Sequence, residues 1–211
     1  EPIAYLIGKK DFWNYEFKIS NNVLVPRPDS ELLIEEVLRL TKNKNKLKLL
    51  DIGVGSGCIL LSILNEKKDF NGVGIDVSKK CINLSKINSL DLKIASRVKF
   101  FKTDVDNFNY GKYDLIISNP PYISENEFPD LMEDVRDYEP KMALTDYSDG
   151  LIFYRRFSQI AKHILKEQGK MILEVGLGSH PRKAKDIFIN QGFSNAKLLK
   201  DFNGDYRILL V

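Results

Sequence analysis

Short apolar runs rich in β-branched residues alternate along most of this 211-residue chain with segments whose apolar residues recur at helical spacing. Because parallel strands need helix-sized crossovers, this alternation predicts a parallel sheet with helices on both faces. The last two runs flank a strong turn dipeptide, Asn203–Gly204, which predicts a closing hairpin and therefore an antiparallel last strand. The seven predicted strands are residues 46–53, 71–77, 97–105, 113–119, 170–176, 195–202 and 205–211.

Helical periodicity separates these strands. Ser78 is expected to cap one helix, and Gly169 and Gly192 to end two others. Ahead of this unit, apolar alternation from Phe12 to Val25 predicts a β-hairpin. We therefore expect residues 1–28 to form a hairpin and linker, and residues 29–211 to form the α/β domain. The predicted helices are residues 30–40, 58–66, 78–92, 150–169 and 181–192.

Composition excludes several classes of protein. A chain that is 43% apolar with a net charge of +3 can bury a real core, and its scattered lysines indicate solvated surfaces rather than a nucleic-acid interface. Cys58 and Cys81 lack metal-ligand spacing and His163 and His180 are isolated, so no metal site is expected. No run approaches the roughly 20 apolar residues of a membrane span, and no signal peptide is visible. We expect a cytoplasmic monomer with reduced thiols and no direct nucleic-acid binding.

Glycine-rich and polar segments follow four of the predicted strands: "DIGVGSG", "GID", "TDV" and "SNPPY". Ligands of parallel sheets bind at the carboxyl ends of the strands, near the point where strand order reverses. The four segments are therefore expected to meet along one rim of the sheet. Their convergence is a stronger signal than any one motif.

The first of these segments places Gly53, Gly55 and Gly57 between a strand and a helix. Glycines let the backbone turn tightly and approach a ligand closely. The spacing is G-x-G-x-G, whereas the dinucleotide fingerprint is G-x-G-x-x-G. The loop alone is therefore a weak signal.

Three acids give the loop a more specific meaning. Asp51 would repel a pyrophosphate and would suit an ammonium group, while Asp76 is placed to accept two ribose hydroxyls. Asp104 ends the third strand, and Val105 follows where an adenine ring can rest. Each acid alone is equally explained as a helix cap or turn residue. Together they predict S-adenosylmethionine, with binding residues Asp51, Gly53, Val54, Gly55, Ser56, Gly57, Asp76, Val77, Asp104, Val105 and Asn119.

The "SNPPY" segment holds an amide on a stiff backbone. Proline biases the preceding residue toward extended geometry, so Asn119 is expected to be fixed just past a strand end. Its side-chain oxygen and the Pro120 carbonyl can each accept one N–H of a substrate amide, which turns the nitrogen lone pair toward a methyl donor. The Tyr122 ring can stack on a flat amide or base and neighbour a sulfonium. We predict Asn119, Pro120 and Tyr122 as catalytic and Asn119, Pro120, Pro121 and Tyr122 as substrate-binding; a proline-rich turn with a buried tyrosine is the alternative.

Several motifs together resemble a known family. "NPPY" alone is shared by DNA adenine methyltransferases, some guanine-N2 RNA methyltransferases and the HemK/PrmC glutamine methyltransferases. The segments that resemble HemK/PrmC in the right order are "EPIAYLIGKKDFW", "VLVPRPDSELLIE", "LLDIGVGSGCILLSI", "SNPPYIS", "DVRDYEPKMAL" and "DGLIFYRRF". The resemblance covers essentially the whole chain.

The resemblance implies a Rossmann-like class I S-adenosylmethionine-dependent methyltransferase with a seven-stranded, mostly parallel sheet. It implies methylation of the side-chain amide nitrogen (N5) of the glutamine in the Gly-Gly-Gln motif of peptide-chain release factors. The resemblance also implies a small helical N-terminal domain, which we expect to be absent from residues 1–211. Because the chain opens on Glu1, we expect it to be a processed product or a domain of a longer chain.

Two other functions stay open: methylation of an exocyclic base nitrogen of RNA or DNA, and a nucleotide-binding module without catalysis. Three residue roles stay open as well. Arg27, in "PRPD", either lines the mouth of the site or caps a helix. The segment Tyr138–Pro140 is either a lid or a packing loop. Glu174 is either a buried partner within the sheet or a mouth residue.

Overall fold

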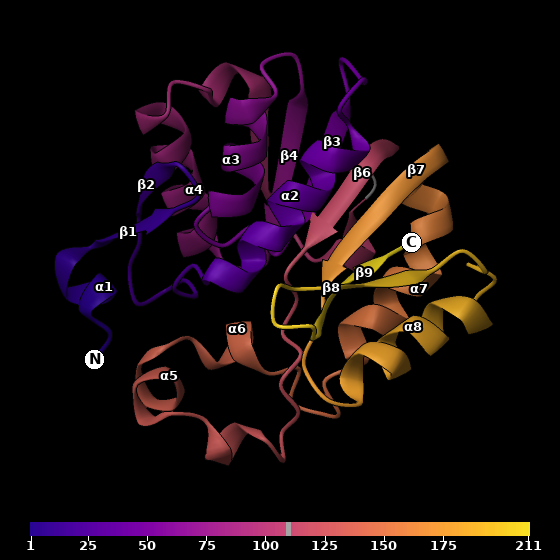
Figure 1. The fold of residues 1–211 in the computed structure, drawn as a ribbon. Coiled ribbons are helices and arrows are strands. Elements are labelled where there is room, and N and C mark those ends of the chain that lie inside the picture. Colours follow the sequence, from indigo (N-terminus) through magenta and orange to yellow (C-terminus); the bar gives the residue numbers. More distant parts are fainter. Residues whose placement is uncertain (109–110) are drawn as a thin grey trace.

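The computed structural model describes residues 1–108 and 111–211. Within these residues a two-stranded hairpin, β1-β2, precedes a seven-stranded sheet with the order β5-β4-β3-β6-β7-β9-β8 (Figure 1). The strands are β1 (Lys9–Phe12), β2 (Tyr15–Lys18), β3 (Lys48–Ile52), β4 (Asn71–Asp76), β5 (Val98–Lys102), β6 (Tyr113–Ser118), β7 (Leu165–Glu174), β8 (Lys197–Lys200) and β9 (Tyr206–Leu210).

Helices connect these strands and cover the sheet. The α-helices are α1 (Ile3–Ile7), α2 (Glu31–Leu40), α3 (Cys58–Glu66), α4 (Lys79–Asp91), α5 (Glu133–Tyr138), α6 (Lys141–Leu144), α7 (Ile152–Ile164) and α8 (His180–Asn190). Short 3-10 helices are η1 (Pro28–Ser30), η2 (Ala95–Arg97), η3 (Val105–Asn107) and η4 (Phe128–Asp130). The predicted cap of α4 is confirmed, since the Ser78 side chain accepts a hydrogen bond from the Cys81 N–H.

The strand order creates a switch point between β3 and β6. From β3 the chain builds outward through β4 and β5, then returns to add β6 and β7 on the other side, all in parallel. Strand β9 is antiparallel to both β7 and β8. This confirms the predicted α/β class, with a mostly parallel sheet and an antiparallel last strand. The carboxyl ends of β3 and β6 therefore flank a crevice of the kind that binds ligands in such sheets.

Alternate residues of the strands feed two separate cores, as the pleat of a sheet requires. Leu49 and Leu115 pack with α2, α3 and the hairpin on one face, whereas Leu50 and Ile116 pack with α7 and α8 on the other. Helices thus cover both faces (Figure 1). Because each central strand is buried on both sides, the carboxyl ends of the strands are held on a rigid platform.

The hairpin lies earlier than predicted. Strand β1 ends at Phe12 and strand β2 begins at Tyr15, and Trp13 in the turn between them is in the left-handed region at φ 56°. Glu66 of α3 accepts hydrogen bonds from the Trp13 indole and the Tyr15 hydroxyl, which fix this turn on the domain. Residues 19–25 alternate in burial without pairing as a strand, so the alternating pattern through Val25 extended the prediction too far.

The helix predicted for residues 150–169 ends earlier, at Ile164, and Leu165 already begins β7. Gly169 does not close the helix. It lies within the strand, where an added Cβ would come within 3.0 Å of the Tyr113 carbonyl oxygen. Its neighbour Gln168 has a positive φ of 64°, and the β6–β7 register shifts between Tyr113 and Leu115. The glycine therefore serves a strand irregularity, which is its other common role.

The segment that carries η4, α5 and α6 lies beyond the carboxyl ends of β6 and β7, at the bottom of Figure 1. It follows the "NPPY" motif directly and returns to the domain through an isolated bridge between Ile123 and Thr145. Among the described residues, no helix is long and apolar enough to cross a bilayer.

Candidate active site

A cavity opens at the carboxyl ends of β3, β4, β5 and β6, as predicted for the rim. Most of the residues predicted to bind the cofactor or substrate line it. These are Gly53, Val54, Gly55, Ser56, Asp76, Val77, Asp104, Val105, Asn119, Pro120 and Pro121. The structure therefore brings together four segments that are far apart in sequence.

The glycine loop is shaped by its own backbone. Gly53 and Gly55 have φ values of 76° and 54°, and both Gly53 and Val54 donate N–H groups to the Ile75 carbonyl at the end of β4. A Cβ on Gly53 would meet no other atom within 4 Å, so open space lies beside this residue. Glycine at these positions both permits the turn and leaves room for a ligand close to the main chain.

Asp76 ties the loop to the second strand. Its Oδ2 accepts from the Gly55 N–H at 3.1 Å, and its Oδ1 accepts from the Ser78 N–H at 2.8 Å. Burial raises the pKa of this carboxyl, while these backbone donors favour its charged form. The side chain is fixed from behind by two donors and lines the cavity, so its remaining lone pairs are available to a ligand.

Asp51 and Gly57 lie near the cavity without lining it. The Asp51 side chain is 2% exposed, and burial together with the neighbouring Asp76 charge raises its pKa to about 8. A Cβ on Gly57 would come within 2.9 Å of Leu61, and its φ is 86°. Gly57 thus serves packing and backbone geometry, and Asp51 lies behind the loop.

The Asp104 side of the cavity contains residues that the sequence analysis missed. Asp104 caps η3 through the Asp106 N–H and pairs with Arg156 of α7, which also bridges Asp106 at 2.7 Å. Phe153, one turn earlier on α7, lines the same cavity. Phe153 and Arg156 are three residues apart on a predicted helix, and that spacing was the only signal that they share a face.

Asn119 is held by a chain of buried polar groups. Its Nδ2 donates to Ser30 Oγ at 2.9 Å, and that hydroxyl donates to Glu174 Oε2 at 2.6 Å. The other oxygen of Glu174 accepts from the Tyr122 hydroxyl at 3.0 Å and lies 3.5 Å from Arg207. Ser30 is 3% exposed and Glu174 1%, so Glu174 is the buried partner, not the mouth residue, of the two open alternatives.

Tyr122 lines a second cavity rather than the first. Asn119 and Pro120 line both, so the two cavities meet at these residues. Burial, and secondarily the Glu174 charge, raises the pKa of Tyr122, which keeps its hydroxyl protonated and donating. Val135, Ala143 and Leu144 from the α5–α6 segment line the second cavity.

The α5–α6 segment is anchored by a buried carboxylate. Glu139 accepts from the Val25 N–H at 3.1 Å and forms an ion pair with Arg27. Its side chain is 1% exposed. Arg27 also lines both cavities, so it lies at the mouth, and its guanidinium bonds to Glu139.

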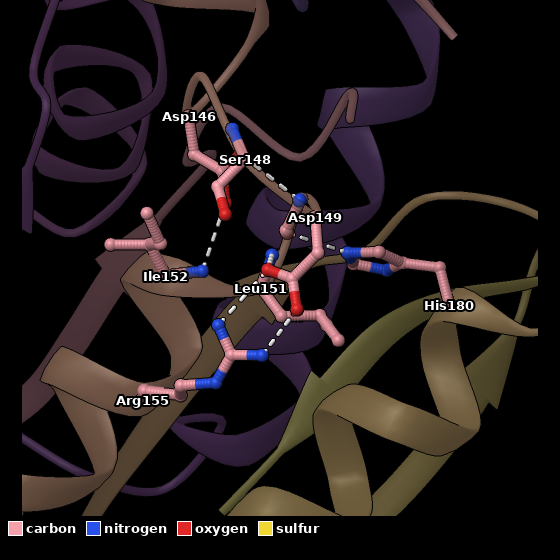
Figure 2. A network of polar contacts seen from close by, with 8 residues as sticks. Asp146, Ser148, Asp149, Leu151, Ile152, Arg155 and His180 are labelled. Atoms are coloured by element: carbon pink, nitrogen blue, oxygen red, sulfur yellow. Dashed lines mark hydrogen bonds and ion pairs between the residues drawn. The ribbon is translucent and has the colours of Figure 1, made fainter. Parts of the chain in front are cut away.

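A turn around Asp146 forms a second anchor, and its polar contacts are drawn in Figure 2. Asp146 accepts the N–H groups of Ser148, Gly150 and Ile152, and the His180 ring lies 3.0 Å from the Gly150 carbonyl. A Cβ on Gly150 would come within 2.3 Å of the Tyr122 carbonyl oxygen, at a φ of +79°. This turn therefore presses directly on the backbone of the motif, and only glycine fits there.

His180 completes this support as a neutral ring. Its Nδ1 accepts from the Gly176 N–H at 3.1 Å, which leaves Nε2–H to donate to Gly150. Burial lowers its pKa, in agreement with this arrangement. The ring packs between Tyr122 and Tyr154 at centroid distances of 5.9 and 5.1 Å.

The family model for the methyltransferase small domain matches residues 28–135. This interval contains the glycine loop, Asp76 and the "NPPY" motif. A crystal structure of a methyltransferase from Pyrococcus furiosus is similar over 92% of this chain and 86% of that chain, with a TM-score of 0.64 and 18% identity. That likeness supports the class I fold.

Sequence relatives are much closer. A release factor glutamine methyltransferase of Clostridium acetobutylicum is 40% identical over 99% of this chain and 74% of its own length. One of Fusobacterium nucleatum is 37% identical over 100% of this chain, which spans only 59% of that protein. The chain belongs to the family of release factor glutamine methyltransferases.

Proposed function

We propose that this protein transfers a methyl group from S-adenosylmethionine to the side-chain amide nitrogen of the glutamine in the Gly-Gly-Gln motif of peptide-chain release factors. One observation carries the proposal: Asn119 and Pro120 line both cavities, together with Leu24, Arg27 and Ala143. One of these has the glycine loop and Asp76, and the other has Tyr122. A donor and an acceptor entering from opposite sides would meet at the asparagine.

The first cavity suits S-adenosylmethionine, which supplies an electrophilic methyl group on a sulfonium when bound. The turn at Gly53–Gly55 leaves open space next to the main chain, and Asp76 presents a carboxylate fixed from behind by two backbone donors. Carboxylates in this position bind ribose hydroxyls in related sheets. Val77 and Val105 would bound the adenine, and Asp51 would act on the ammonium group from behind the loop.

The second cavity suits a primary amide. Since Asn119 Nδ2 is engaged by Ser30, Oδ1 is the amide atom left to accept a substrate N–H. The Pro120 carbonyl, in the lining of the same cavity, would accept the other. Gripping both hydrogens fixes the amide plane, so that the nitrogen lone pair, which is perpendicular to that plane, faces the methyl group; positioning of this kind supplies several orders of magnitude in rate. The proton is acidic once the nitrogen carries the methyl, so no strong base is required.

The relatives support the choice of substrate, because those in C. acetobutylicum and F. nucleatum are named for release factor glutamine methylation. A nucleic-acid substrate has no such support. The small net charge of +3 also offers little attraction for a polyanion.

The test is an intact-mass measurement. A release factor is incubated with this protein and S-adenosylmethionine, and we expect one added methyl group, located on the Gly-Gly-Gln glutamine by peptide mapping. A release factor with that glutamine replaced by alanine is the matched control and should gain nothing. Methyl transfer to RNA or DNA, with none to the release factor, would contradict the proposal.

A further inference from the structure

We propose that Ser30 and Glu174 are positioning residues that fix which end of the Asn119 amide faces the acceptor. This rests on the proposed function, since it concerns the same methyl transfer. The two residues come from distant parts of the chain, η1 and the end of β7. They meet Asn119, which lines both cavities.

The direction of each hydrogen bond follows from the carboxylate at the end of the chain. An ionised Glu174 can only accept, so the hydrogen of the Ser30 hydroxyl must point toward Oε2. A hydroxyl has one hydrogen, and therefore Ser30 Oγ can offer only a lone pair to Asn119. Asn119 must therefore donate from its NH2 group, and its Nδ2 lies 2.9 Å from Ser30 Oγ.

The orientation matters because a carboxamide has two chemically opposite ends. With Nδ2 held by Ser30, Oδ1 is presented as an acceptor for a substrate N–H. If the amide turned over, an NH2 group would face the incoming NH2, and the substrate would meet a donor instead of an acceptor. The rotamer alone does not select between these states, because the two ends have nearly the same shape.

Three neighbouring groups favour the ionised form of Glu174, which this arrangement uses. Arg207 lies 3.5 Å from Oε1 and is itself bridged to Asp29 at 2.9 Å, and Tyr122 donates to the same oxygen. From α7, the Tyr154 hydroxyl donates to the Glu174 main-chain carbonyl. Burial raises the pKa of Glu174, whereas Ser30, Arg207 and Tyr122 all favour its charge.

The first experiment compares single variants by steady-state kinetics with release factor and S-adenosylmethionine. We expect Ser30→Ala to lower kcat by about 10- to 100-fold, the range for a lost positioning contact, with KM and the Kd for S-adenosylhomocysteine changed less than about threefold. Ser30→Thr retains the hydroxyl and should restore most of the rate. The matched control is Ser62→Ala, since Ser62 is equally buried but its Oγ has no hydrogen-bond partner among the described residues.

The second experiment tests whether the two residues act as one unit. Glu174→Gln removes the charge that orients the hydroxyl, and we expect a similar loss of kcat. The double variant Ser30→Ala/Glu174→Gln should then be little worse than either single variant, because the same orientation is lost only once. If Glu174→Gln fails to fold, Ser30→Ala and its rescue by Ser30→Thr still decide the matter.

The outcomes separate the two proposals. Equal kcat values for the unaltered protein and Ser30→Ala would overturn the positioning role and leave the proposed function standing. Multiplicative losses in the double variant would also overturn it. Absence of methyl transfer by the unaltered protein would overturn the proposed function, and the positioning role with it.

Discussion

Two carboxylates are buried at the same edge of the sheet, and their surroundings differ. Glu174, at the end of β7, has a donor on each oxygen and an arginine at 3.5 Å. Asp51, in β3, is as deeply buried, and among the described residues none of the ion pairs involves it. Its nearest charged influence is Asp76, which has the same sign. Both acids accept hydrogen bonds, Asp51 from the Leu60 backbone N–H, but only Glu174 also has a positively charged neighbour within the described residues.

The difference indicates that the β3–β4 side and the β6–β7 side of the site have different roles. Burying a carboxylate without a countercharge is costly, and a protein relieves the cost by protonation or by a cation from outside. We therefore propose that Asp51 and Asp76 lie on the side of the site that takes a positively charged ligand. Glu174 belongs to a side that is already complete, and its charge is used to orient Asn119. We therefore expect changes on the β3–β4 side to affect cofactor binding, and changes on the β6–β7 side to affect the chemical step.

The largest effect is expected for Asn119→Ala. Removing this acceptor, which lines both cavities, should lower kcat by at least about 1,000-fold, because both positioning and polarity are lost. The Kd for S-adenosylhomocysteine, measured by calorimetry, should stay within a few-fold. If binding of the cofactor product were lost together with the rate, the two sides would not be separable as we propose.

Asp76→Asn should have the opposite effect to Asn119→Ala: weaker cofactor binding with little change in kcat. The substitution removes a charged acceptor and weakens the anchor of the Gly55 N–H, so cofactor Kd should rise by about 10- to 100-fold, in line with the 1.5–3 kcal/mol of a hydrogen bond to a charged group. At saturating cofactor, kcat should remain within about threefold of its original value. Asp11→Asn, at an exposed acid of β1, serves as the control. A loss confined to kcat would contradict the assignment.

Asp51→Asn gives a smaller effect with a pH signature. The pKa of Asp51 is raised to about 8 in the folded protein against an ordinary value near 4, so ionising it costs more in the fold than in the unfolded chain. Its contribution to stability is therefore highest below about pH 4 and is lost progressively up to about pH 8. The variant does not titrate, so its Tm advantage over the unaltered protein should widen from pH 5 to pH 8. With cofactor present, the Tm advantage of the variant should shrink, because we expect the variant to bind the cofactor about tenfold more weakly. A Tm difference between the two proteins that is constant with pH would contradict the prediction.

The contrast between these acids also shows which parts of the site could be predicted from the sequence. The rim, the switch point and the placement of Asp76 and Asn119 follow from local signals: apolar periodicity, glycines and prolines beside strand ends. The partners of Glu174 leave no local signal. Ser30 lies 89 residues from Asn119 and 144 from Glu174, so their contact depends on how η1 folds across the end of the sheet.

The same limit explains the two errors in element bounds. The helix prediction ran past Ile164 because the start of β7 is mostly exposed and polar, as a helix surface also is, whereas in the structure Leu165 pairs with Tyr113 of β6. Likewise, the hairpin turn at Trp13 is set by Glu66, which belongs to a helix 53 residues away. In each case a distant partner, absent from any local window, decided between two conformations that the sequence allowed.

The smallest effect is expected at a third buried carboxylate, Glu139. It tests whether every buried acid with a charged partner helps to orient the reacting atoms. Glu139, 1% exposed, pairs with Arg27 and holds the α5–α6 segment over the second cavity. Arg27→Gln keeps a hydrogen-bond donor but removes the charge, so we expect KM for release factor to rise about three- to fivefold, with kcat little changed, since partly exposed pairs contribute about 1 kcal/mol. The matched control is Arg39→Gln, which breaks a pair between an exposed arginine and buried Glu36 on α2. A fall in kcat for Arg27→Gln with unchanged KM would place Glu139 with Glu174, among the groups that orient the reacting atoms.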